Sequence, residues 1–90
     1  MWEIRYSSKF KKDLKRYRNQ PQKIEKLEIV LKDLRDTGTV QAAYRPHMLA
    51  GNYIGCMECH IEGDFLLIWI DEQEHTISLV RLGSHSELFK

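Results

Sequence analysis

The spacing of the apolar residues changes partway along this chain, and this change restricts the fold more than any other feature. From Phe10 to Gly38, apolar side chains recur every three or four positions, as Phe10 and Leu14 do, which is the spacing of a helix that buries one stripe. Beyond residue 52 they lie in three short blocks separated by polar turns. These blocks cover residues 53–61, 64–71 and 76–82. The sequence therefore predicts two packed helices followed by three antiparallel strands.

The ends of the predicted helices carry residues suited to those positions. Ser7 can cap the first helix, Pro21 suits the first turn of the second, and Gly38 can end it. Ser84 and Glu87 have the spacing of a capping box, which predicts one short helical turn at the C-terminus. The second helix has the clearest buried stripe: Ile24, Leu27, Val30, Leu31 and Leu34.

The first residues alternate, with Trp2, Ile4 and Tyr6 apolar and charged residues between them. This period of two predicts a half-buried strand. Residues 39–52 show no period and are predicted to form a loop that carries His47. The predicted fold class is α+β, in which the first strand joins the three later antiparallel strands in a four-stranded sheet.

The length and composition favour one domain, residues 1–90, with a single core. No apolar run approaches the ~20 residues that cross a bilayer, and the N-terminus does not have the pattern of an export signal. We therefore expect a cytoplasmic protein that makes no contact with a membrane.

The net charge of +1 conceals an uneven distribution along the sequence. Up to Arg35, eleven Lys or Arg face five Asp or Glu, whereas after it three face eight. A basic helical half favours an anionic partner such as RNA or an acidic protein segment, although a solvated lysine-rich surface has the same composition. Lys12, Lys15 and Arg16 are candidates for RNA contact.

Histidine exchanges a proton near neutral pH, so the histidines are candidates for acid–base chemistry. If Glu62 and Gly63 form a two-residue hairpin loop, Cys59 pairs with Leu66, and His60 lies on the sheet face away from the helices, opposite Phe65. The same register places Leu67, Val80 and Leu82 on the His60 face. It places Arg81 on the same side of its strand as the core-facing residues. Asp64, Arg81 and His85 then lie at one edge of the sheet with His60, and the first turn after Ser84 offers N–H groups to a phosphate.

Residues 56–60 spell CxxCH, a pattern of haem attachment, and its CxxC half also occurs in zinc and redox sites. Within a strand, however, side chains three positions apart point to opposite faces, so Cys56 and Cys59 should neither pair nor bind an ion together. We therefore expect two reduced, half-buried cysteines, and neither a metal nor a cofactor.

Two stretches, residues 60–68 and 81–89, together with His47 ahead of Leu49-Ala50-Gly51, resemble the YafQ branch of the RelE/ParE toxin superfamily. The resemblance extends over nearly the whole chain. It implies the toxin of a type II toxin–antitoxin system: a ribosome-associated endoribonuclease that cuts mRNA without a metal. It also implies a cognate antitoxin that silences the toxin, and a toxin–antitoxin complex that binds operator DNA.

By the same resemblance, the family's functional residues fall on His47, His60, Asp64 and His85, and Arg81 matches a residue that holds the phosphate. Phe65 and Phe89 match aromatic neighbours of the site, where they would stack an exposed base; Phe89 could equally cover the second face of the sheet. Two positions depart from the family pattern. Phe65 replaces a common tryptophan, and Met57 replaces an arginine, which puts one phosphate contact in doubt.

These residues suit attack by a ribose 2′-hydroxyl on its own 3′-phosphate. We expect His85 to be the general acid, His60 or Asp64 the base, and His47 to position the substrate. Two alternatives stay open at this point: a non-catalytic module that binds RNA or an antitoxin through its basic helices and acts as a corepressor, and a relative of the gyrase-poisoning toxins.

Overall fold

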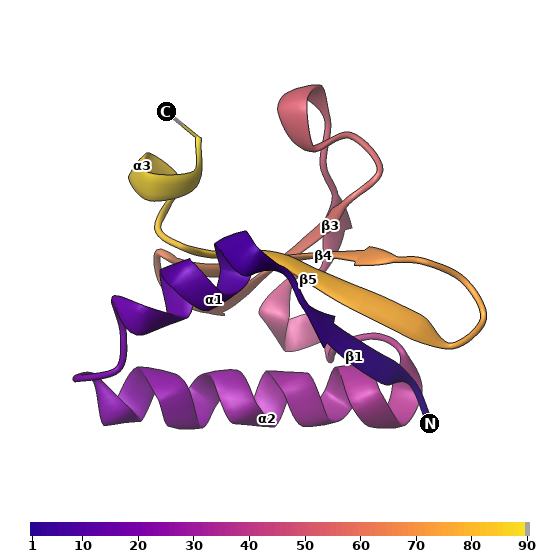
Figure 1. Cartoon of the computed structure of the whole chain (residues 1–90), viewed down its shortest axis with the longest axis horizontal. Coiled ribbons are helices and arrows are strands. Elements are labelled where there is room, and N and C mark those ends of the chain that lie inside the picture. Colours follow the sequence, from indigo (N-terminus) through magenta and orange to yellow (C-terminus); the bar gives the residue numbers. More distant parts are fainter. Residues whose placement is uncertain (90) are drawn as a thin grey trace.

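A sheet with the strand order β1-β5-β4-β3-β2 forms the centre of the molecule (Figure 1). The computed structural model describes residues 1–89, and within this range the sheet has five strands. The strands are β1 (Glu3–Tyr6), β2 (His47–Met48), β3 (Met57–Glu62), β4 (Phe65–Asp71) and β5 (Thr76–Gly83). The helices are α1 (Ser8–Lys15), α2 (Pro21–Thr37) and α3 (His85–Leu88), with short 3-10 turns at Ala42–Tyr44 and Gly51–Tyr53.

The predicted α+β class and the order of strand, helical hairpin and meander are confirmed. The sheet has a fifth strand because His47 and Met48, predicted as loop, pair with Glu58 and Met57 of β3. Two residues are too few to show a period, so this strand had no signal in the sequence. The edge strand β1 runs parallel to β5, whereas the other pairs are antiparallel.

The helix ends follow their local signals. The hydroxyl of Ser7 accepts a hydrogen bond of 3.0 Å from the backbone N–H of Phe10, which caps α1. Pro21 begins α2, and Gly38 ends it with a left-handed φ of 78°. A methyl group at Gly38 would lie 2.6 Å from the Trp2 indole, so this close approach also favours glycine.

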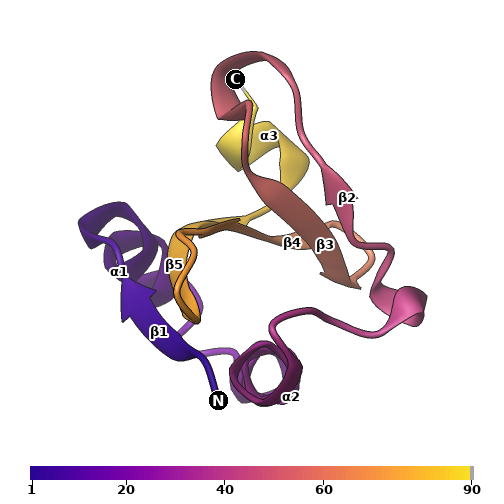
Figure 2. The ribbon, with the colours of Figure 1, turned by 90° about the vertical axis from the view of Figure 1, so that its right-hand side faces the viewer.

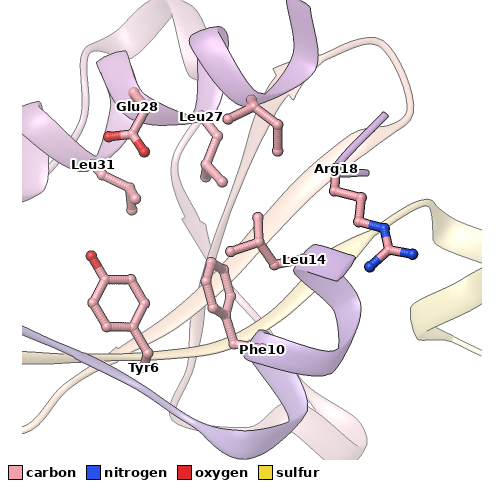
Figure 3. Close-up of a pocket in the computed structure, with 8 residues that line it drawn as sticks. Tyr6, Phe10, Leu14, Arg18, Leu27, Glu28 and Leu31 are labelled. Atoms are coloured by element: carbon pink, nitrogen blue, oxygen red, sulfur yellow. The ribbon is translucent and has the colours of Figure 1, made fainter. Parts of the chain in front are cut away.

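Helix α2 covers one face of the curved sheet (Figures 1 and 2). Its predicted stripe is buried from Leu27 to Leu34 and packs against the inward side chains of the strands, among them Phe65, Leu67 and Trp69. Between α1, α2 and β1 this core opens into an apolar hollow (Figure 3). The hollow is lined by Tyr6, Phe10, Leu14, Arg18, Ile24, Leu27, Glu28 and Leu31.

The predicted register of the first hairpin was wrong by one residue. Glu62 pairs with Phe65, so the loop is Gly63-Asp64, and a bulge at Ile61 leaves Cys59 opposite Leu67. Leu67 therefore lies in the α2-side core, while Leu66 and Ile68 lie on the other face. His60 points away from the helices, as expected, because its own parity within β3 is unchanged.

A second bulge, in β5, explains why Arg81 does not face the core. Trp69 pairs with Leu79 but Ile68 pairs with Arg81, which leaves Val80 as the extra residue. Leu79 and Leu82 both face the α2-side core, so the predicted place of Leu82 beside His60 was wrong. Arg81 is thereby turned out of that core.

Among residues 1–89, no helix is long and apolar enough to cross a membrane.

Candidate active site

Three imidazoles form a row on the sheet face opposite α2. His47 comes from β2, His60 from β3 and His85 from the first turn of α3. The ring centroids of His47 and His60 are 5.9 Å apart, and those of His60 and His85 are 6.0 Å apart. The structure thus brings together the three histidines that the sequence singled out. His75, at the opposite end of β4, lies against Trp2 instead.

Asp64 holds His85 at one end of this row. The Asp64 Oδ1 atom lies 2.7 Å from His85 Nδ1 and accepts a 2.8 Å hydrogen bond from the His85 backbone N–H. These hydrogen bonds keep the pKa of the Asp64 carboxyl below its usual value. An ionised Asp64 fixes the proton of His85 on Nδ1 and leaves Nε2 free to exchange a proton with a substrate.

The same contacts change the predicted role of the α3 N-terminus. The His85 N–H donates to Asp64, and the Glu87 N–H donates to the Ser84 hydroxyl within the capping box. These two donors are already satisfied by the protein. The expectation that the N–H groups at the start of this turn hold a phosphate was therefore wrong for His85 and Glu87.

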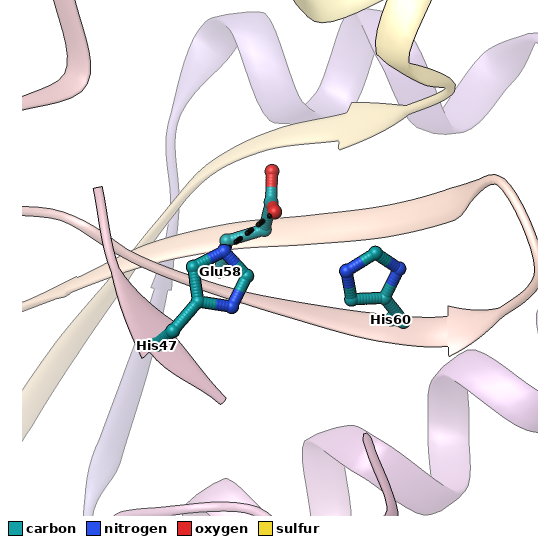
Figure 4. Close-up of side chains that lie close together, drawn as sticks. All are labelled: His47, Glu58 and His60. Atoms are coloured by element: carbon teal, nitrogen blue, oxygen red, sulfur yellow. Dashed lines mark ion pairs between the residues drawn. The ribbon is translucent and has the colours of Figure 1, made fainter. Parts of the chain in front are cut away.

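His47 is paired with a buried carboxylate. Its Nε2 atom lies 3.0 Å from Glu58 Oε1 (Figure 4). Its Nδ1 atom lies 2.9 Å from the carbonyl of Arg45. Glu58, the second residue of β3, is only 2% exposed although it is acidic. Sequence reasoning did not select Glu58, but a signal existed: Glu58 and His60 are two apart in a strand, so they share a face.

An aromatic pair borders the row of histidines. Phe89 is 42% exposed, and its ring lies 5.7 Å from His85 and 5.3 Å from Tyr53 in an edge arrangement. The Tyr53 hydroxyl donates to the Leu88 carbonyl at 3.0 Å, which fixes α3 against the sheet. Tyr53 was not selected from the sequence, because it lies in a 3-10 turn predicted as the start of a strand.

Phe65 does not belong to this aromatic surface. It is 1% exposed and packs against Tyr17, with ring centroids 4.7 Å apart, on the α2 side of the sheet. The expectation that Phe65 stacks a base was therefore wrong. The cause is the one-residue error in the hairpin register, which exchanged the faces of β4.

Arg81 lies beside the site but is strongly held by the protein itself. Its Nε and Nη2 atoms donate to the Asp13 carboxylate at 2.6 and 3.1 Å, and Nη1 donates to the Tyr53 hydroxyl at 3.3 Å. Asp13 is 2% exposed and also accepts from the Leu82 N–H at 3.0 Å. The hydrogen bonds that Arg81 donates to Asp13 raise the pKa of Arg81. Arg81 is thus a fixed positive group with few donors left for a phosphate.

The basic residues predicted to contact RNA lie in α1 and at its C-cap, and they are arranged unevenly. Lys12 and Arg16 line a shallow groove together with Lys9, Asp13 and Arg81, and Lys15 is not among its lining residues. The Arg16 Nη1 atom lies 3.5 Å from Asp13 and 3.7 Å from Glu87. This groove extends positive charge from α1 toward Arg81.

The two cysteines are free and belong to apolar clusters on opposite faces of the sheet, as the strand spacing predicted. Both are buried, not half-buried as expected; Cys59 is fully buried, and burial raises the pKa of its thiol to about 12. The CxxCH pattern therefore has a structural explanation in strand packing.

Comparison with known proteins gives consistent matches over the whole chain. Residues 2–90 match the family described as bacterial toxin of type II toxin-antitoxin system, YafQ. The chain is 30% identical over 88 residues to the mRNA interferase toxin YafQ of Escherichia coli K12, which covers 97% of this chain and 95% of that protein. A metal-bound toxin from Helicobacter pylori is 41% identical, with a TM-score of 0.84 over 99% of this chain and 100% of that one. The E. coli DinJ–YafQ complex matches with 28% identity and a TM-score of 0.85 over 100% of both chains.

Proposed function

This chain belongs to the YafQ family of bacterial toxins from type II toxin–antitoxin systems, and on that premise we propose that it is an endoribonuclease that cleaves mRNA on the ribosome. The observation that carries the proposal is the row of three imidazoles, spaced by 5.9 and 6.0 Å. This spacing lets neighbouring rings reach atoms of one phosphodiester. The curated E. coli relative is named an mRNA interferase.

In the proposed reaction the ribose 2′-hydroxyl attacks the adjacent phosphorus and the 5′-oxygen leaves. His85 is the general acid, because Asp64 holds its Nδ1 and leaves Nε2 to protonate the leaving oxygen. Asp64 itself is a positioning residue, since its lowered pKa makes it a weak base.

His60 is the proposed base. Its Nδ1 atom faces the carbonyl of Gly63 at 3.4 Å, and since a carbonyl only accepts, the free lone pair is on Nε2. His47, paired with Glu58 at 3.0 Å, positions the substrate between the base His60 and the acid His85. Charge on the phosphoryl oxygens is offset by the neighbouring Arg81 and by the groove that contains Lys12 and Arg16. The chemistry of these side chains requires no metal step.

Phe89 and Tyr53 give the site a place where a nucleobase of the RNA can stack. The exposed ring of Phe89 lies beside His85, so a nucleotide next to the cleaved bond can stack on it. E. coli YafQ forms a toxin–antitoxin complex with DinJ, and we propose that a cognate antitoxin silences this chain in the cytoplasm and that their complex binds operator DNA.

Ribosome-dependent cleavage by purified variants tests the proposal. His85→Ala and His60→Ala should each lower the cleavage rate by about 10²–10⁴-fold, the usual contribution of acid–base catalysis. His75→Ala is the matched control, because His75 lies at the other end of the sheet, and it should keep the parental rate. Full cleavage by both site variants would overturn the proposal.

The same variants, induced in cells, distinguish the two alternatives. A corepressor would keep its growth effect in both histidine variants and lose it when Lys12, Lys15 and Arg16 are changed to glutamate. A gyrase poison would change DNA supercoiling after induction and leave mRNA intact.

A further inference from the structure

We propose that His47, Glu58 and His60 form a binding site for a divalent transition-metal ion such as Zn²⁺, and that the bound ion switches the nuclease off. One ligand atom from each residue can be chosen so that all three lie within 4.8 Å of one another (Figure 4). Ligand atoms around a tetrahedral Zn²⁺ lie about 3.4 Å apart, given bonds of about 2.0–2.1 Å. Small rotations of the two imidazoles would close that difference.

The strongest support comes from the buried carboxylate of Glu58. Its Oε1 atom faces His47, but its Oε2 atom is buried and has no hydrogen-bond partner among residues 1–89. A buried carboxylate oxygen without a partner is costly, and proteins seldom keep one without a reason. A cation between Glu58 and the two imidazoles would compensate this oxygen.

The hydrogen bonds behind the rings point their other nitrogens toward the same space. The Arg45 carbonyl lies 2.9 Å from His47 Nδ1 and the Gly63 carbonyl lies 3.4 Å from His60 Nδ1. Because a carbonyl only accepts, each Nδ1 carries a proton. The Nε2 of His60 then has its lone pair free for a metal, whereas the Nε2 of His47 faces Glu58 Oε1 at 3.0 Å, so the metal would replace the direct contact between His47 and Glu58. Backbone carbonyls hold metal-binding histidines in this way.

The donor set selects the class of ion. Two imidazole nitrogens and one carboxylate leave a coordination position open and suit Zn²⁺ or Cu²⁺. Mg²⁺ and Ca²⁺ prefer oxygen ligands and should bind weakly here. Since β2 and β3 are neighbouring strands, the sheet itself supplies all three ligands without any movement of the helices.

The effect of the ion on cleavage rests on the proposed function. A metal bound to His60 Nε2 takes the lone pair that the proposed base needs, and a metal at His47 and Glu58 occupies the place of the substrate. The site would therefore make the toxin inactive while zinc or copper is bound, and active again when a chelator removes the ion.

Calorimetry on the full, metal-stripped chain tests the site independently of activity. We expect one Zn²⁺ or Cu²⁺ per chain and no measurable Mg²⁺ binding. Glu58→Gln and His47→Gln should each weaken Zn²⁺ binding at least tenfold, whereas Glu62→Gln is the matched control. Glu62 is in the same strand but pairs with Lys23 and Lys26 at its end. Circular dichroism confirms that each variant is folded. Absence of one-to-one binding, or unchanged affinity in both site variants, would overturn the metal site.

A cleavage assay with and without excess Zn²⁺ then tests the switch. The parent chain should lose at least nine-tenths of its rate and regain it with EDTA. His85→Gln should still bind Zn²⁺ while it cleaves poorly, because His85 is not a proposed ligand. A chain that binds Zn²⁺ and still cleaves at the metal-free rate contradicts the switch. A chain that binds Zn²⁺ but never cleaves, even with EDTA, contradicts the proposed function and leaves the metal site supported by calorimetry.

Discussion

The face of the sheet that α2 covers and the face that carries the histidines differ in what their buried residues are. On the α2 face the buried cluster consists of aliphatic and aromatic side chains and Cys59, from Phe10 to Leu82, and the hollow beside it is lined mainly by apolar side chains (Figure 3). The opposite face buries a smaller apolar cluster around Leu66 and Ile68, and next to it the carboxylate of Glu58. The comparison shows that the residues that stabilise the fold and those proposed to carry out the chemistry lie largely on opposite faces of one sheet.

The largest expected effect is on the α2 face. Leu34→Ala removes a side chain that is 0% exposed, so the free energy of unfolding should fall by about 2–5 kcal/mol. Ile29→Ala, on the exposed side of the same helix, should change it by less than about 0.5 kcal/mol. Urea unfolding measures both. If Leu34→Ala slowed cleavage without lowering the free energy of unfolding, the separation of the two faces would fail.

Asp13 should affect both properties, because it lies where the faces meet. It holds Arg81 and the Leu82 N–H, so Asp13→Asn leaves a partly buried guanidinium without its charged partner. We expect a loss of about 2–3 kcal/mol in the free energy of unfolding, below the range for a fully buried pair because Arg81 is partly exposed. Cleavage should slow in proportion to the loss of folded protein. Asp36→Asn, in an exposed pair with Lys32, should have no measurable effect. Parental stability in Asp13→Asn would show that this ion pair contributes nothing.

A smaller effect should appear in the pH dependence of stability. The hydrogen bond from the Tyr17 hydroxyl, at 2.6 Å, is the main cause of a lowered pKa at Glu87, and it ties α3 to the turn that follows α1. A carboxyl with a lowered pKa stabilises the fold above its unfolded pKa of about 4.3, and this contribution is lost as the pH falls through the lower, folded value. The free energy of unfolding should therefore decline between about pH 5 and pH 3, and less steeply in Glu87→Gln. Identical slopes in the two proteins would exclude Glu87 as a source of the decline.

The smallest change concerns the cysteines, one on each face. Burial raises the pKa of both thiols, to about 12 for Cys59, so neither should react readily with a thiol reagent near neutral pH. Cys56, at 8% exposed against 0% for Cys59, should react first. The time course of labelling in Cys56→Ser and Cys59→Ser measures the difference. Faster labelling of Cys59 would mean that the α2 face opens more readily than the histidine face.

Much of the fold was predictable because its signals are local. The helical stripe, the caps at Ser7 and Ser84, and the alternation of the strands each depend on residues close in sequence. The bulges at Ile61 and Val80 were not predictable, since an extra residue changes the pairing of strands without a distinctive composition. That single kind of error misplaced Leu67, Leu82 and Phe65.

The site was predictable to a similar extent. His60, Asp64 and His85 follow from the order of strands and turns, which places them at one edge of the sheet. Glu58 could have been found from its parity with His60. The pair between Asp13 and Arg81 could not, because the partners are 68 residues apart and meet only after the sheet and α1 have packed.

The chemical ends of the cut RNA test the central claim most directly, namely that side chains of the histidine face transfer protons while a ribose hydroxyl attacks. mRNA cleaved by the purified chain on ribosomes can be analysed by mass spectrometry of the fragments. The account predicts a 2′,3′-cyclic phosphate on one fragment and a 5′-hydroxyl on the other. A 5′-phosphate with a 3′-hydroxyl would contradict it, because that product requires a different nucleophile.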